Sequence, residues 1–179
     1  IGCYGDDMKA NLRNSVDAGQ LEEVYGPLSV KMLTDTSLVQ IWRILFVANF
    51  YSGATSKDFE QSFDLSRLEF IILFCLSHKP GLTAQEVCAV TGHPKNSISR
   101  AVKDLLGKKL IDRKARGSDR RNKNLTMTAQ GKKFLKLVIP IFEKRQSDML
   151  AFLSEKEQRQ LEVLMSKLAF GASMWASTD

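Results

Sequence analysis

Basic, amide and hydroxyl side chains gather between residues 95 and 103, at a spacing that places them on one side of a helix. They are Lys95, Asn96, Ser97, Ser99, Arg100 and Lys103. An arginine can give two parallel donors to guanine, an asparagine amide can pair with adenine, and lysines neutralise phosphates. We therefore predict a DNA-contacting surface here. The alternative interpretation is a merely solvated helix face.

A second basic cluster follows about one helix length later in the chain. Arg116, Arg120 and Arg121 surround Asp119 in the segment 115–122. Arginines suit a narrow minor groove, where the negative potential is enhanced. A single acid among them can orient a neighbouring guanidinium by a charge-assisted hydrogen bond. The alternative is a loop that only improves solubility.

The charge distribution supports a polyanionic partner. Residues 93–136 hold nine Lys, five Arg and three Asp, a net charge of +11, whereas the whole chain carries +6. The remaining residues are therefore mildly acidic. One strongly basic segment on an acidic body is the pattern expected of a nucleic-acid-binding protein.

Arg43 stands alone among large apolar residues, beside Trp42 and Phe46. A cation in such surroundings needs a partner. One hypothesis is an ion pair with an acid such as Asp64 or Glu69. The other is a clamp for the carboxylate of a small effector, in a cleft lined by Trp42, Phe46 and further aromatic side chains.

Neither catalysis nor metal binding is predicted. Cys75 and His78, with Cys88 and His93, have spacings that permit a zinc site. Both cysteines, however, fall on the apolar stripes of predicted helices, where cysteine behaves as a small hydrophobe. No nucleophile–base pair or glycine-rich phosphate loop is found, so we expect no cofactor and no enzymatic activity.

Length and composition set the class of protein. The chain has 179 residues, 44% of them hydrophobic and 26% charged, which is typical of a globular protein. No apolar run reaches the length of a membrane span, and no secretory signal is visible in residues 1–7, which we expect to be processed or upstream sequence. Three cysteines are too few for a disulfide framework, so a cytoplasmic location is expected.

The elements that would position the basic residues can be placed from capping signals and periodicity. Ser66–Glu69 and Thr83–Glu86 are capping boxes that open two helices. The first helix ends at Lys79-Pro80-Gly81, and a tight turn at 91–93 leads to a helix over 94–108, with Pro94 at its first position. The inner stripe of that helix is Ile98, Ala101, Val102, Leu105 and Leu106. A short helix, a tight turn and an amphipathic basic helix predict a helix-turn-helix.

The following segments predict a basic hairpin and two further helices. Residues 110–114 and 123–127 form the strands, and 115–122 form the tip. Thr128 caps a helix from 129 to about 152, which Pro140 should kink. Ser154–Glu157 is a third capping box and opens the last helix.

The first long helix indicates a partner subunit. Residues 35–51 are apolar almost all round, and such a helix must be buried on several sides. The preceding residues 1–33 are predicted to be an arm with one short helix over 16–25. A chain of this size has too little other material to cover the long helix, so a homodimer is expected.

Residues 65–168 resemble the multiple-antibiotic-resistance regulator (MarR) family. The resemblance rests on these segments in this order: Thr83-Ala-Gln-Glu-Val, Ser97-Ile-Ser-Arg-Ala-Val-Lys-Asp-Leu-Leu, Leu110-Ile-Asp-Arg, Asp119-Arg-Arg and Leu125-Thr-Met-Thr-Ala-Gln-Gly. It implies a mainly α-helical homodimer: a winged helix-turn-helix lobe with a small two-stranded β wing, and an α-helical dimerisation lobe. It also implies that the 94–108 helix enters the major groove and that Arg121, oriented by Asp119, enters the minor groove.

The resemblance has one departure. Lys109 stands where family members often carry glycine after the recognition helix, and a non-glycine residue in a left-handed conformation there costs roughly 1–2 kcal/mol. The domain prediction is an arm (1–33), a dimerisation helix with a connector (34–64), the DNA-binding lobe (65–128) and C-terminal dimerisation helices (129–179).

These observations predict a sequence-specific transcriptional regulator. Its expected partners are double-stranded DNA with a palindromic operator, a second copy of the chain, and a small organic acid or phenolic effector that releases it as a repressor. The alternative is an architectural nucleic-acid-binding protein without an effector.

Overall fold

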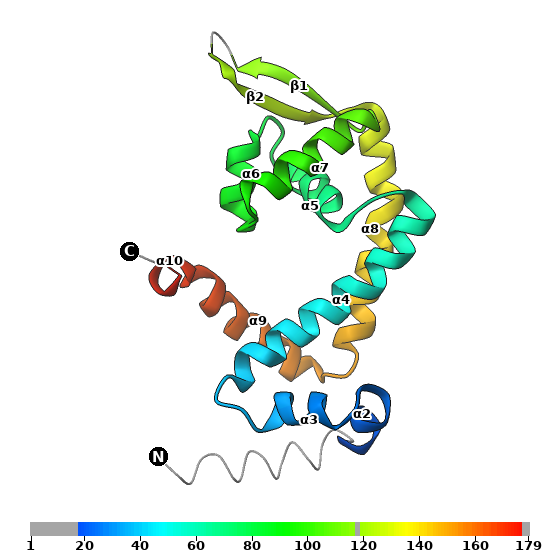
Figure 1. Cartoon of the computed structure of the whole chain (residues 1–179), viewed down its shortest axis with the longest axis vertical. Coiled ribbons are helices and arrows are strands. Elements are labelled where there is room, and N and C mark those ends of the chain that lie inside the picture. Colours follow the sequence, from blue (N-terminus) through cyan, green and yellow to red (C-terminus); the bar gives the residue numbers. More distant parts are fainter. Residues whose placement is uncertain (1–17, 117–118, 177–179) are drawn as a thin grey trace. The chain divides into compact units, whose positions relative to one another are not determined.

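A computed structural model gives the arrangement of the chain (Figure 1). It describes residues 18–116 and 119–176, and within them all side chains except those of 18, 20, 53–61, 115, 116 and 119–122. The chain divides into two compact parts at residues 53 and 54, and each part is described by itself. None of the helices in these ranges is both long and apolar enough to cross a membrane.

The described portion of the first part consists of three helical segments. α2 covers Ala18–Tyr25, α3 covers Pro27–Thr34, and α4 begins at Val39 and ends at Phe63 in the second part. The prediction of one short helix in this arm was incomplete. Gly26 adopts φ 81° and lets the chain turn, and Pro27 then begins a second helix, where its missing N–H costs nothing.

The long helix also differs from its prediction of 35–51. It starts four residues later and continues beyond Tyr51 to Phe63. In its N-terminal half Ile41, Leu45 and Val47 are exposed within this single chain, so the burial expected against a partner subunit stays a prediction. Tyr25 packs edge-on against Phe46 and Phe50, with ring centroids 5.6 and 4.8 Å away.

The second part carries the helix-turn-helix and the wing. In chain order after α4 it contains α5 (Arg67–His78), α6 (Ala84–Thr91), α7 (Lys95–Gly107), β1 (Ile111–Arg116), β2 (Asp119–Met127), α8 (Ala129–Leu150), α9 (Glu155–Phe170) and α10 (Ala172–Trp175). All three predicted capping boxes are present, with both reciprocal hydrogen bonds, at Ser66, Thr83 and Ser154. The predicted mainly helical fold with a two-stranded wing is confirmed.

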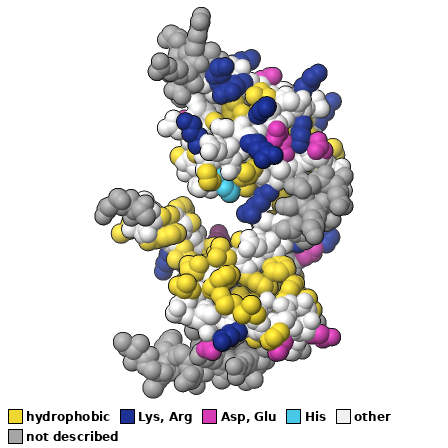
Figure 2. All heavy atoms as spheres, viewed as in Figure 1, with side chains coloured by type: hydrophobic (Ala, Val, Ile, Leu, Met, Phe, Trp, Pro, Cys, Tyr) yellow, Lys and Arg dark blue, Asp and Glu magenta, His cyan; other side chains and the backbone are white. Residues whose placement is uncertain are grey.

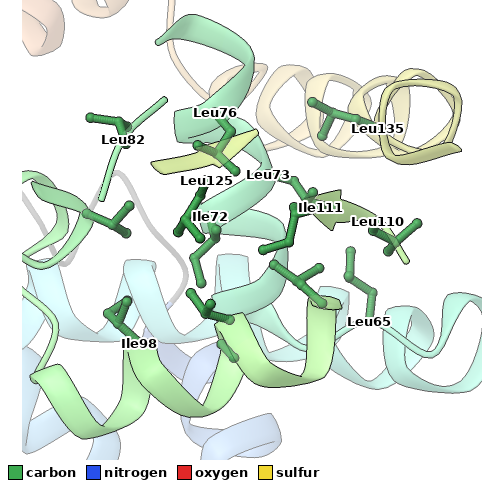
Figure 3. Close-up of a cluster of buried hydrophobic side chains, with 14 of the residues drawn as sticks. Leu65, Ile72, Leu73, Leu76, Leu82, Ile98, Leu110, Ile111, Leu125 and Leu135 are labelled. Carbon is green, nitrogen blue, oxygen red and sulfur yellow. The ribbon is translucent and has the colours of Figure 1, made fainter. Parts of the chain in front are cut away.

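The core lies where α5, α7, α8 and the base of the wing meet. Figure 3 shows buried side chains from these elements pointing toward one another, among them Leu73 of α5, Ile98 of α7, Ile111 of β1 and Leu135 of α8. The predicted inner stripe of α7 is confirmed for Ile98, Ala101, Val102 and Leu105, while Leu106 is only partly buried. Because this stripe is buried, the opposite side of α7 must face away from the core.

The wing is an antiparallel hairpin whose base is joined to the loop after α5. β1 and β2 pair from Ile111 opposite Met127 to Ala115 opposite Lys123, and the register shifts between Ala115 and Arg116. Leu125 also forms a bridge with Leu82, which precedes α6. This bridge connects the wing directly to the helix-turn-helix.

α8 begins against the base of the wing. The Thr128 hydroxyl accepts the N–H of Gly131 and donates to the Lys109 carbonyl. Gly131 is buried, and its α-carbon lies so close to the Leu110 carbonyl that a β-carbon would come within 2.1 Å of that oxygen. The helix continues through Pro140 and ends at Leu150, two residues before the predicted end.

Candidate nucleic-acid interface

α7 presents the predicted contact side chains on one exposed face. Gly92, with φ 68°, ends α6 and turns the chain toward α7. Pro94 is the residue before the helix and not its first residue, which corrects the prediction by one position. Lys95, Asn96, Ser99, Arg100 and Lys103 are exposed, and Ser97 is half-buried. The sequence therefore positions a polar surface on a helix whose other side is fixed by the core.

This face can make two kinds of contact with DNA. Arg100 and Asn96 lie four residues apart and so share one side of the first turns of α7. Both can hydrogen-bond to base edges. Lys95 is the first residue of α7 and Lys103 lies about two turns further along; both suit phosphates better than bases. Figure 2 shows further Lys and Arg side chains spread over the helix-turn-helix and the wing.

The wing gives only part of the predicted site. The backbones of Asp119, Arg120 and Arg121 belong to β2, but their side chains lie outside what the structure describes. The orientation of Arg121 by Asp119 thus stays a prediction. Sequence reasoning named no cation on the strands themselves, yet Arg113, Lys114 and Lys123 are exposed on the wing. Their only sequence signal is the local excess of positive charge.

The last turn of α7 is held by an ion cluster that the sequence did not reveal. The Lys108 ammonium lies 2.9 Å from Glu69 Oε1 and 3.5 Å from Asp64 Oδ2, and it also donates to the Asp64 carbonyl. Burial disfavours the charged form of Lys108, but the hydrogen bond and charge of Glu69, with those of Asp64, outweigh it and raise the pKa of Lys108. Directly after it, Lys109 has φ 58°, so this non-glycine residue does adopt the left-handed conformation.

Comparisons with known proteins agree with this architecture. A profile of the MarR family matches residues 63–122, which include the helix-turn-helix and much of the wing. The HTH-type transcriptional regulator BilQ of Clostridium symbiosum (strain WAL-14163) is 28% identical over 124 residues, which are 69% of this chain and 85% of BilQ.

Solved structures give the same result for the fold. A MarR/EmrR family transcriptional regulator from Acinetobacter sp. ADP1 is 26% identical, with a TM-score of 0.66 over 74% of this chain and 93% of that one. The Staphylococcus aureus MepR–DNA complex is 23% identical, with a TM-score of 0.65 over 73% and 96%. A Mycobacterium tuberculosis MarR family protein in complex with p-aminosalicylic acid is 22% identical, with a TM-score of 0.59 over 72% and 96%.

Residues 63–122 thus carry a winged helix-turn-helix that is similar to that of the MarR family. The matched relative BilQ is a transcriptional regulator, and this chain has the winged helix-turn-helix that the family profile describes. The fold class expected from the sequence is confirmed, and the comparisons agree with the expected family and with DNA binding as the general function. The individual residues that contact DNA stay predictions.

The predicted effector residues lie on α4 in the first part. The Arg43 side chain is half-buried, and its Nε donates to the Leu33 carbonyl at 2.9 Å. Asp64 and Glu69, the acids named as examples of a partner for Arg43, bind Lys108 within the second part, and an ion pair of Arg43 with an acid stays a prediction. Trp42 is 40% exposed, and Phe46 packs on Tyr25 and Phe50.

The two cysteines in the described ranges lie in apolar surroundings. Cys75 and Cys88 are free thiols, each half-buried beside the core. Burial raises the pKa of Cys75, which lowers the fraction of reactive thiolate, against a smaller opposing backbone hydrogen bond. Within the described ranges no three His, Cys, Asp or Glu side chains are arranged to hold a metal ion.

Proposed function

We propose that this protein is a homodimeric MarR family repressor that binds a palindromic operator and leaves it when a small organic acid or phenolic compound binds. The observation that carries the DNA-binding half is the exposed face of α7, placed on a buried apolar stripe. A helix fixed in this way can enter a major groove without reorganising. The MepR–DNA complex, which has the same fold, supports the proposal.

In this proposal base readout and charge attraction belong to different residues. Arg100 and Asn96 read base edges, Ser97 and Ser99 contact bases or phosphates, and Lys95 and Lys103 neutralise phosphates. In the wing, Arg120 and Arg121 approach the minor groove, and Asp119 orients Arg121.

A pair of variants of α7 tests this division. Arg100→Ala should cost roughly 1–3 kcal/mol on the specific site and relax the preference at one base pair of each half-site. Lys103→Ala should weaken binding about equally on specific and scrambled duplexes and lower the salt slope by about one per subunit. Titrations at two salt concentrations distinguish the two effects. If Arg100→Ala lowers the affinity for the specific and the scrambled duplex equally, base readout by α7 is contradicted.

The dimer is proposed from apolar surface that one chain leaves uncovered. On α9, Leu161, Leu164, Met165 and Leu168 share one face, and all are at least 36% exposed. On the N-terminal half of α4, Ile41, Leu45 and Val47 are exposed as well. Apolar faces of this kind mark interfaces between proteins.

The effector half of the proposal rests on Arg43 with Trp42 and Phe46. A guanidinium beside aromatic rings suits an aromatic carboxylate. The M. tuberculosis relative in complex with p-aminosalicylic acid supports this ligand class. The effector would act by favouring a spacing of the two recognition helices that mismatches the operator.

Salicylate and p-aminosalicylic acid are suitable probes. We expect millimolar salicylate to weaken operator binding by the parent protein, Arg43→Ala to lose that response, and Arg43→Lys to keep part of it. Folding of each variant is checked by thermal unfolding, because Arg43 also holds the Leu33 carbonyl. A parent protein whose DNA affinity no organic acid or phenol changes would favour the architectural alternative.

A further inference from the structure

One ion cluster fastens the end of α7 to the beginning of α5. Lys108 is the first residue after α7, and its ammonium reaches Glu69 Oε1 and both the carboxylate and the carbonyl of Asp64. Asp64 is the residue that follows α4. Lys108 therefore joins the exit of α7 to the corner between α4 and α5.

Glu69 is the central member because it is buried and performs two tasks. Its side chain is 3% exposed; Oε2 accepts the Ser66 N–H at 2.7 Å, and Oε1 faces Lys108. A buried carboxylate is costly unless it is paired. The Lys108 ammonium must therefore lie beside the Glu69 carboxylate, and this ion pair holds the last turn of α7 against α5.

The backbone on both sides of the cluster is strained. Asp64 has φ 48° and Lys109 has φ 58°, and neither is a glycine. Each left-handed residue is disfavoured for an L-amino acid and persists only where the surroundings impose it. Asp64 belongs to the cluster and Lys109 directly follows Lys108, so the cluster can hold both turns in place.

We propose that Glu69 and Lys108 are positioning residues for DNA recognition. They set the orientation of α7 against the helix-turn-helix core and so determine discrimination between operator and other DNA. This inference rests on the proposed role of α7 in base readout. A buried ion pair often adds little net stability, and its best-attested use is to specify one arrangement among several.

Glu69→Gln tests the proposal because its expected sign opposes simple charge attraction. Glutamine can replace glutamate in a capping box, so α5 keeps its N-terminus. The protein gains one positive charge, and charge attraction alone predicts tighter binding to all DNA. We expect instead roughly threefold to tenfold weaker binding to the operator, with unchanged or slightly tighter binding to a scrambled duplex.

Asp104→Asn is the matched control. It makes the same change of charge on the exposed side of α7, one turn before Lys108. We expect it to tighten binding on both duplexes. If Glu69→Gln behaves in the same way as Asp104→Asn, the positioning role is overturned.

A double variant separates positioning from stability. Lys108→Met leaves Glu69 buried and unpaired and should destabilise the fold, whereas Glu69→Gln with Lys108→Met removes both charges and should restore thermal stability. Positioning predicts that the ratio of operator to scrambled affinity stays low in the double variant. Recovery of that ratio together with stability would show a purely structural role and overturn the proposal.

Arg100→Ala shows which hypothesis has failed. If it lowers the operator-to-scrambled ratio and Glu69→Gln does not, base readout by α7 stands and only the positioning role is wrong. If neither variant changes the ratio, the proposed role of α7 itself is wrong.

Discussion

At the scale of the single residue, Lys109 combines an unfavourable conformation with a defined structural task. Its φ of 58° turns the chain from α7 into β1, and its carbonyl accepts the Thr128 hydroxyl. A side chain in this region costs roughly 1–2 kcal/mol, while glycine adds roughly 0.5–1 kcal/mol of unfolded-chain entropy. The free energy of the strain is larger than the entropy cost of a glycine, so glycine is favoured at this position.

Lys109→Gly is therefore expected to stabilise the protein by about 0.5–1 kcal/mol, measured by urea unfolding. The control is Lys103→Gly in the interior of α7, which should destabilise by about 1 kcal/mol, because no left-handed strain is relieved there. A loss of stability in Lys109→Gly would show that the lysine side chain, and not the backbone, decides this position.

The residue scale also shows what the sequence could not supply. The contact of Lys108 with Glu69 joins residues far apart in the chain, and no periodicity or capping signal predicts such a pair. The capping box predicted for Glu69 is confirmed, but it uses only Oε2 of the carboxylate. Oε1 is left for a second partner, Lys108. Both acids named as examples for Arg43 contact Lys108, because local sequence cannot rank competing cations.

At the scale of the element, one glycine lets α8 approach the backbone at the base of the wing closely. A β-carbon on Gly131 would meet backbone atoms of Leu110, and backbone cannot rotate away as a flexible side chain can. Gly131→Ala should destabilise by about 1–3 kcal/mol or more, through displacement of α8 from the base of β1.

Gly107→Ala is the matched comparison, because a β-carbon there meets nothing within 4 Å. Gly107 is the last residue of α7 and has no positive φ, so alanine should stabilise by about 0.5 kcal/mol, the low end of the mid-helix range. Thermal unfolding of both variants checks the opposite signs. Equal effects would mean that the tight contact at Gly131 has no energetic consequence.

Elements that carry their own signals were predictable from sequence. Capping boxes placed the starts of α5, α6 and α9 because each depends on residues three apart. The second arm helix was missed because Gly-Pro both ends one helix and begins another. The end of α4 was placed too early because residues 52–62 lack a clear apolar stripe.

At the scale of the whole molecule, the exposed apolar face of α9 leads to a prediction about assembly. Leu164 is 58% exposed in the single chain, so Leu164→Glu should leave the fold of each chain intact. We expect this variant to sediment as a monomer at micromolar concentration, while the parent sediments as a dimer.

Val163→Glu is the control, since Val163 is 54% exposed but lies roughly on the opposite side of α9. It should remain dimeric. A parent chain that is a stable monomer would contradict both the dimer and the proposed effector mechanism, which needs two recognition helices at a variable spacing.

The bridge between Leu125 and Leu82 has a consequence for hydrogen exchange. The Leu125 N–H donates to the Leu82 carbonyl at 2.8 Å, and the Leu125 carbonyl accepts the Gly81 N–H at 2.9 Å. The Leu125 amide exchanges with deuterium only when the loop after α5 separates from the sheet, and we expect that opening to cost nearly as much free energy as global unfolding. Amides nearer the tip are bonded only to the opposite strand, so they should exchange faster. Insertions beyond Ala115 would thus leave the anchored base untouched, so the reach of the wing can change during evolution while the helix-turn-helix keeps its register.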